Sequence, residues 1–158
     1  MIAALLAVAL SAPPEVYRLR ESFIETVDNK EKFEILGELE RTPPKSIADI
    51  QALYDLFLRF PESKVRQAAL GSLQLLDPNT AQSAEPLLLQ YLQDDQPESV
   101  LFGIKGALRL RAPQALPIIG KLAKKKFRYK SAGDAPVLSE RNVWWVQYEA
   151  LAALAQWE

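Results

Sequence analysis

Three stretches of the chain share one pattern: Val65–Leu73 reads VRQAALGSL, Val100–Leu108 reads VLFGIKGAL and Val146–Leu154 reads VQYEALAAL. They align without a gap. In each copy Val comes first, a small or branched residue follows four positions later, and Leu stands eight positions after the Val. Residues at this spacing lie on one face of an α-helix, and Ala or Gly beside them lets a neighbouring helix approach closely. This repeated motif predicts an array of similar helical units.

The rest of the chain also predicts an all-α fold. Apolar residues recur at spacings of three and four, and the chain has neither sustained alternation nor an Asn-Gly or Asp-Gly hairpin turn. Prolines fall mostly between the periodic segments, where helices begin and end. Ser46 is a predicted cap, Pro113 a predicted first helical residue, and Asn142 a predicted cap of the last helix. We expect eight helices, at Val16–Val27, Lys30–Glu40, Ile47–Arg59, Ser63–Leu75, Ala81–Gln93, Glu98–Leu110, Pro113–Lys126 and Asn142–Gln156.

A second helix follows each of the first two motif copies, and these helices are also alike. AQSAEPLLLQYLQ starts at Ala81 and APQALPIIGKLAKK at Ala112, and both place Ala, then Pro, then an apolar cluster in the same order. This pairing resembles HEAT repeats, particularly the short bacterial HEAT-like type, over Ser63–Lys126, with a half-repeat over Asn142–Glu158. Lys30–Arg59 is a weaker candidate for an earlier repeat, because Glu31 replaces the first Val.

The resemblance implies a short right-handed α-solenoid of antiparallel helix pairs, with about three and a half HEAT-like repeats in one domain at residues 13–158. In such a fold each pair buries its apolar face against its neighbours only. The alternative is an irregular helical bundle with coincidental internal similarity. An inserted loop at residues 127–141, FRYKSAGDAPVLSER, interrupts the last repeat. Both a binding loop and a tolerated surface excursion remain open for it.

Residues 1–12 contain the apolar run Ile2–Leu10, followed by small residues and then Pro13 and Pro14. This order is typical of a secretory signal peptide cut after Ser11, although no Lys or Arg precedes the run. A run of this length is too short to span a bilayer, which takes about 20 residues. We expect an exported protein, periplasmic or secreted. The alternative is an apolar N-terminal helix on a cytoplasmic protein.

Composition removes many kinds of active site. The 158 residues include no Cys and no His, which excludes metal sites built on thiolate or imidazole, Cys or Ser-His nucleophile pairs, and disulfides. Asp94, Asp95 and Glu98 cluster around Pro97, but acids at a helix start usually cap it. We therefore expect no enzyme activity, no catalytic residue, no cofactor and no metal.

Charge is uneven along the chain, although the net charge is only -1. Residues 99–133 hold nine cations and no acid, while the segments on both sides are acidic. We interpret the protein as a non-catalytic scaffold whose basic third repeat and adjoining loop bind another protein of acidic character, with Trp144 or Trp145 as an aromatic anchor. The candidate partner-binding residues are Lys105, Arg109, Lys121, Lys124, Lys125, Lys126, Phe127, Arg128, Tyr129, Lys130, Trp144 and Trp145.

Three alternatives to this surface remain open. Lys121–Lys126 could be the solvated end of a helix, where cations complement the exposed carbonyls. Lys124–Lys130 could instead bind nucleic acid or an anionic membrane, with Phe127 or Tyr129 stacking on a base. The third alternative is an enzyme, because the chain also resembles, in fold and small size alone, the HEAT-like lyases that handle linear tetrapyrroles. The sequence makes no prediction of oligomeric state.

Overall fold

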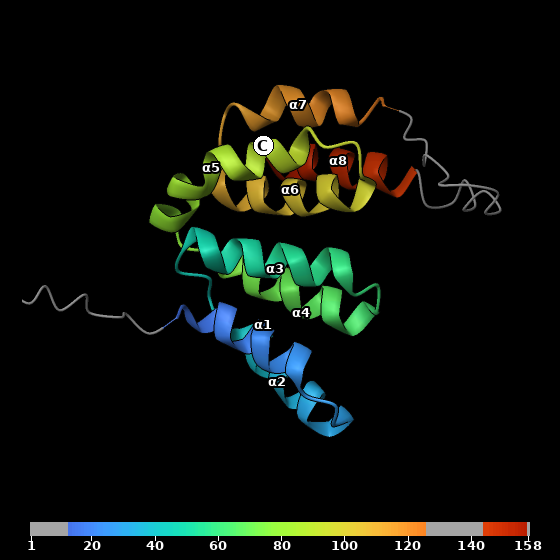
Figure 1. The fold of residues 1–158 in the computed structure, drawn as a ribbon. Helices are drawn as coiled ribbons and strands as arrows, with labels where there is room; N and C mark the ends of the chain where they lie inside the picture. Colours follow the sequence, from blue (N-terminus) through green and yellow to red (C-terminus); the bar gives the residue numbers. More distant parts are fainter. Residues whose placement is uncertain (1–12, 126–143, 158) are drawn as a thin grey trace, which may run out of the picture.

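The computed structural model describes residues 13–125 and 144–157, and within these ranges it contains helices and no strand. The all-α prediction is confirmed. Figure 1 shows the helices lying in layers, with α1 and α2 at one end and α7 at the other. Their bounds are α1 Glu15–Glu25, α2 Asn29–Arg41, α3 Ile47–Arg59, α4 Ser63–Gln74, α5 Pro78–Leu92, α6 Pro97–Leu110, α7 Ala115–Leu122 and α8 Trp144–Trp157.

Side-chain caps mark the starts of α2, α3 and α5. Ser46 caps α3 as predicted, because its Oγ accepts a hydrogen bond from the Asp49 N–H at 3.1 Å. Asp77 caps α5 through bonds from the Asn79 and Thr80 N–H groups at 2.9 and 3.0 Å. With Pro78 as its first residue, α5 begins three residues before the predicted start at Ala81.

The predicted bounds of the seventh helix were wrong at both ends. Pro113 does not open α7; it lies in a preceding turn, where its carbonyl accepts from the Leu116 N–H at 3.3 Å. At the other end the Lys124 N–H bonds to the Lys121 carbonyl, three residues back, at 3.1 Å. Such a bond tightens the last turn and ends the helix at Leu122. The predicted cap Asn142 lies outside the described residues.

The helices pack as consecutive pairs: α1 against α2, α3 against α4, α5 against α6, and α7 against α8. Each helix also contacts the helix two places further along the chain. The three motif copies lie in α4, α6 and α8, so each motif helix is the second member of its pair. This reverses the predicted pairing, in which the motif helix came first.

Side chains in the motif explain this reversal. A Cβ added to Gly103 of α6 would lie 2.7 Å from the backbone nitrogen of Leu92 in α5, so this glycine lets the two helices meet closely. In α4, Arg66 donates from Nε to the Phe57 carbonyl of α3 at 3.1 Å. The motif residues therefore fit the helix before them, a relation that the alignment of the copies does not reveal.

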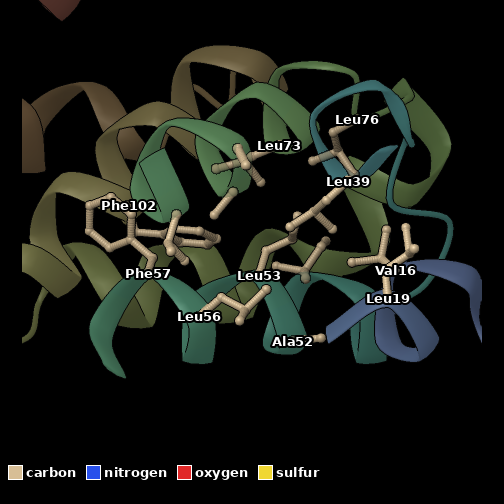
Figure 2. Close-up of a cluster of buried hydrophobic side chains, with 14 of the residues drawn as sticks. Val16, Leu19, Leu39, Ala52, Leu53, Leu56, Phe57, Leu73, Leu76 and Phe102 are labelled. Carbon is tan, nitrogen blue, oxygen red and sulfur yellow. The ribbon is translucent and has the colours of Figure 1, made fainter. Parts of the chain in front are cut away.

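Two hydrophobic clusters form the core. The first is built from α1 to α5 with Phe102 of α6, and Figure 2 shows part of it, including Leu39, Leu53 and Leu73. The second joins Leu92 of α5 to α6, α7 and α8. The clusters meet at the α5–α6 pair, which contributes to both. Phe102 lies there against Phe57, with ring centroids 5.7 Å apart.

A buried carboxylate connects α3 to α1. The Asp49 side chain, 1% exposed, accepts from the Tyr17 N–H at 3.1 Å and from the Lys45 N–H at 2.9 Å. Pro14 precedes α1 and provides no side-chain cap of its own. Asp49 thus supplies α1 with the cap that its own sequence lacks.

Candidate functional site

Helix α8 is unusual among the helices because it is apolar nearly all the way round. Its fourteen residues, WWVQYEALAALAQW, include a single charged residue, Glu149. Val146, Ala150 and Ala153 are buried in the second cluster against α6 and α7. A helix that is hydrophobic on every side is normally buried on every side.

The side of α8 that faces away from the core is exposed. Tyr148 is 61% exposed and Leu151 is 56% exposed, and Ala155 is exposed as well. Their spacings of three and four place them in one row, which we call the α8 stripe: Tyr148, Leu151 and Ala155. Trp144 shares this spacing, but its side chain lies outside the described part of the structure.

Polar contacts hold α8 in place without using the stripe. Lys105 Nζ of α6 lies 2.6 Å from Glu149 Oε2, in an ion pair whose two side chains are about three-quarters buried. At the start of α8, Gln147 Nε2 donates to the Lys125 carbonyl at 2.8 Å. At its end, Arg111 donates to the Trp157 carbonyl at 3.3 Å. The α8 stripe is therefore presented by a helix that is fixed on its other sides.

Two of the predicted binding cations have partners inside the fold. Lys105 pairs with Glu149, as described above. Arg109 donates from Nε to the Leu76 carbonyl, just beyond the end of α4, at 2.9 Å. Both side chains link neighbouring helices, and their role in partner binding stays a prediction.

The remaining described cations of this group lie in or just after α7. Lys121, Lys124 and Lys125 are exposed. No ion pair within the described ranges involves Lys121 or Lys124. Trp145, predicted as an anchor, packs partly buried against the second cluster instead. Outside the described residues lie Lys126, Phe127, Arg128, Tyr129 and Lys130, together with the predicted loop at 127–141.

The end of the molecule at α1 and α2 (Figure 1) has a different surface. Exposed residues of α2 are mostly charged, and they include Lys30, Glu31, Glu34, Glu38, Glu40 and Arg41. Phe33 is the large apolar exception, at 63% exposed. The exposed described residues of α8 carry no charge, whereas Lys121, Lys124 and Lys125 are exposed in and just after the neighbouring α7.

An aromatic cluster lies between α3, α5 and α6, and it contains two tyrosines whose hydroxyl groups could take part in acid–base chemistry. Tyr54 and Tyr91 stack with ring centroids 3.9 Å apart, and the Tyr54 hydroxyl lies 2.8 Å from Ser99 Oγ. Burial raises the pKa of Tyr91, and neighbouring Tyr54 adds to the rise. Burial also raises the pKa of Tyr54. Both phenols therefore stay protonated near neutral pH, and neither is suited to act as a base.

Nearby, an open hollow of about 480 Å³ lies along α5 and is lined by Pro86, Leu89, Gln90, Gln93 and Asp94. Asp94 is its one charged residue, and Oδ1 of Asp94 accepts from the Gln96 N–H at 3.1 Å. This bond closes a turn just before α6, and α6 itself has no side-chain cap. The prediction that the acids around Pro97 cap the helix start is therefore wrong for Asp94.

The described residues contain neither a cluster of metal-binding carboxylates nor a helix that could span a membrane. Within the described ranges, no three Asp or Glu side chains come together as ligands for a metal ion. In the same part of the chain, no helix has both the length and the apolar character needed to cross a membrane.

Comparison with known proteins gave no relative. No family model matches the chain, and no match was found among curated proteins or solved structures.

Proposed function

We propose that the protein is a non-catalytic protein–protein interaction scaffold of the HEAT-repeat type, which binds a partner through the outer side of its last helix pair. The binding surface comprises the α8 stripe and the exposed Lys121 and Lys124. The predicted residues from Lys126 to Lys130 belong to the same proposal. This surface lies further toward the end of the chain than the predicted basic third repeat, because Lys105 and Arg109 have internal partners.

Helix packing supports the proposal of a short right-handed α-solenoid. Helices pair in sequence, and each contacts the helix two places on, as in a stack of two-helix repeats. The motif recurs at the second helix of a pair in α4, α6 and α8. With α7 paired to α8, the proposed array has four helix pairs, not three and a half, since the last motif helix has a partner.

One observation carries the functional proposal: α8 is apolar nearly all the way round, yet its stripe is exposed. The only charge on this helix, Glu149, is neutralised by Lys105 of the same chain. Removing exposed apolar side chains from water is favourable by about 25 cal/mol for each Å² buried. A partner that covers Tyr148 and Leu151 would gain this free energy, and the fixed position of α8 keeps the ordering cost low.

The test compares two variants as bait. The stripe variant carries Tyr148→Glu and Leu151→Glu, and its matched control carries Gln156→Glu, at an exposed α8 residue outside the stripe. We expect a protein from extract of the native host to bind the wild type and the control but not the stripe variant. That protein is then purified and titrated against all three. The proposal fails if no protein distinguishes the stripe variant from the control.

We also propose that the protein is exported, on the strength of the apolar run in residues 1–12. N-terminal sequencing of protein from its native host is the test. A mature chain beginning at Ala12 is expected, and a chain that retains Met1 contradicts export.

A further inference from the structure

We infer that the α8 stripe takes one α-helix of a partner protein, with an apolar row on its inner face and Asp or Glu on the edge that faces α7. This inference rests on the proposed function and adds the chemistry of the partner. The argument has three steps: the direction in which the stripe faces, the charge beside it, and the comparison with a second copy of the chain.

The first step concerns direction. In the gapless alignment of motif copies, Leu151 of α8 occupies the position that Lys105 holds in α6. Lys105 lies on the side of α6 that meets the next motif helix, where it pairs with Glu149 of α8. Leu151 therefore lies on the side of α8 where a following helix would pack. The stripe is suited to the same kind of neighbour, which is an α-helix.

Small residues on this side allow close packing. Ala155 is in the stripe, and Ala152, one residue after Leu151, is half-buried beside it. Tyr148 to Ala155 spans about 10 Å along the helix axis, at about 1.5 Å per residue. A docked helix of four to five turns, roughly 16 residues, more than covers this length with an i, i+3, i+4 row of apolar side chains.

The second step concerns charge. Helix α7 packs along α8, and Lys121 and Lys124 stand exposed at the end of α7. Helix α7 itself, ALPIIGKL, contains no acid, and the single acid of α8 is paired with Lys105. A partner helix with carboxylates along the α7 edge would neutralise these cations, whereas a basic edge would add repulsion.

The third step weighs a second copy of this chain against a different protein. A second copy placing its own α7 and α8 here would bring more cations and no unpaired acid from those helices. A separate helix with an acidic edge would instead bring carboxylates to Lys121 and Lys124. Charge therefore favours a separate, acidic helix.

The experiment uses a displayed library of helical peptides of roughly 16 residues. The library is selected on the full-length wild-type protein after clearing it on the stripe variant. We expect the enriched peptides to share an apolar row and an acidic flank. One of them, resynthesised, should bind about tenfold more weakly to the stripe variant and to a Lys121→Glu, Lys124→Glu variant, and equally well to the Gln156→Glu control.

Each other outcome overturns the inference. Enriched peptides without an acidic flank, or no enrichment, contradict the stated partner chemistry. A dimer in analytical ultracentrifugation that the stripe variant abolishes would assign the surface to a second copy. A host protein that needs the stripe but binds through a non-helical segment would refute this inference and leave the proposed function intact. Circular dichroism and thermal melting of every variant confirm that its fold is unchanged.

Discussion

At the scale of single residues, Asp49 shows how one side chain fixes several backbone groups. Its two carboxylate oxygens accept hydrogen bonds from Tyr17 of α1 and from Lys45, just before α3. Its own N–H donates to the Oγ of Ser46, the predicted cap of α3. The sequence could not reveal that the carboxylate serves a helix 32 residues earlier.

We predict that Asp49→Ala lowers the free energy of unfolding by about 2–3 kcal/mol, because two part-buried N–H donors lose their acceptor. Urea denaturation followed by circular dichroism measures the change. Asp95→Ala, at an exposed acid, is the control and should change stability by less than about 0.5 kcal/mol. Equal effects of the two substitutions would contradict the capping role of Asp49.

Tyr91 predicts a loss of stability at high pH. Its pKa in the folded protein is raised above the ordinary value of 10.0 by burial and by Tyr54. Above about pH 10 the unfolded chain therefore loses this proton while the folded chain keeps it, so stability falls as pH rises. The slope contributed by one such group is at most about 1.4 kcal/mol per pH unit.

Urea denaturation of wild type and Tyr91→Phe between about pH 9 and pH 11 tests this, because the substitution removes the titrating group. We expect a shallower fall for the variant, with Tyr148→Phe as the matched control at an exposed tyrosine. Parallel curves for wild type and Tyr91→Phe would show that Tyr91 does not contribute.

At the scale of helices, the sequence predicted the elements well because the signal for a helix is local. Apolar spacing identified all eight helices, and α3 has its predicted bounds. Errors arose where the signal was ambiguous. The predicted start of α5 misses Pro78, although Asp77 before it is a good cap. The predicted start of α7 at Pro113 is two residues too early.

The glycines of α6 and α2 give a paired prediction for helix packing. Gly103→Ala places a Cβ 2.7 Å from the Leu92 nitrogen and 3.0 Å from the Tyr91 carbonyl carbon, which must push α5 and α6 apart. We expect a loss of about 1–3 kcal/mol. Gly37→Ala in α2 meets no atom within 4 Å and should instead gain about 0.5–1 kcal/mol, as Ala favours the helix. Thermal melting of both variants is the measurement, and a stabilising Gly103→Ala would refute the close approach of α5 and α6.

At the scale of the whole molecule, the sequence predicted an all-α fold but not which helices pair. Pairing depends on which helix faces meet. The motif does not indicate whether its helix packs against the helix before it or the helix after it. The candidate site was affected in the same way. Lys105 and Arg109 looked available because their partners, Glu149 and the Leu76 carbonyl, are 44 and 33 residues away. The spacing of Trp144, Tyr148, Leu151 and Ala155 already indicates the α8 stripe. The prediction of Trp144 or Trp145 as an aromatic anchor did not include Leu151.

The charge distribution predicts how the protein responds to polyanions. Nucleic-acid binding depends on several cations that are free to contact phosphates. In residues 99–125, Lys105, Arg109 and Arg111 all bind groups within the chain, and this leaves few exposed cations without an ion pair, among them Lys121 and Lys124. We therefore expect short DNA duplexes, single-stranded RNA and anionic vesicles not to bind, even at about 50 mM salt, as measured by fluorescence anisotropy and vesicle sedimentation. Saturable binding that Lys124→Glu weakens would instead support the nucleic-acid or membrane alternative.

The cap that Asp49 supplies to α1 also has a consequence for the order of events during synthesis. Tyr17 leaves the ribosome well before Asp49, since 32 residues separate them in the chain. Until then α1 has neither a side-chain cap nor the α3 surface on which Val16 and Leu19 pack. An isolated helix of eleven residues is marginal in water. Helix α1 is therefore made before it can be stable, and it waits for α3 before it adopts its final form.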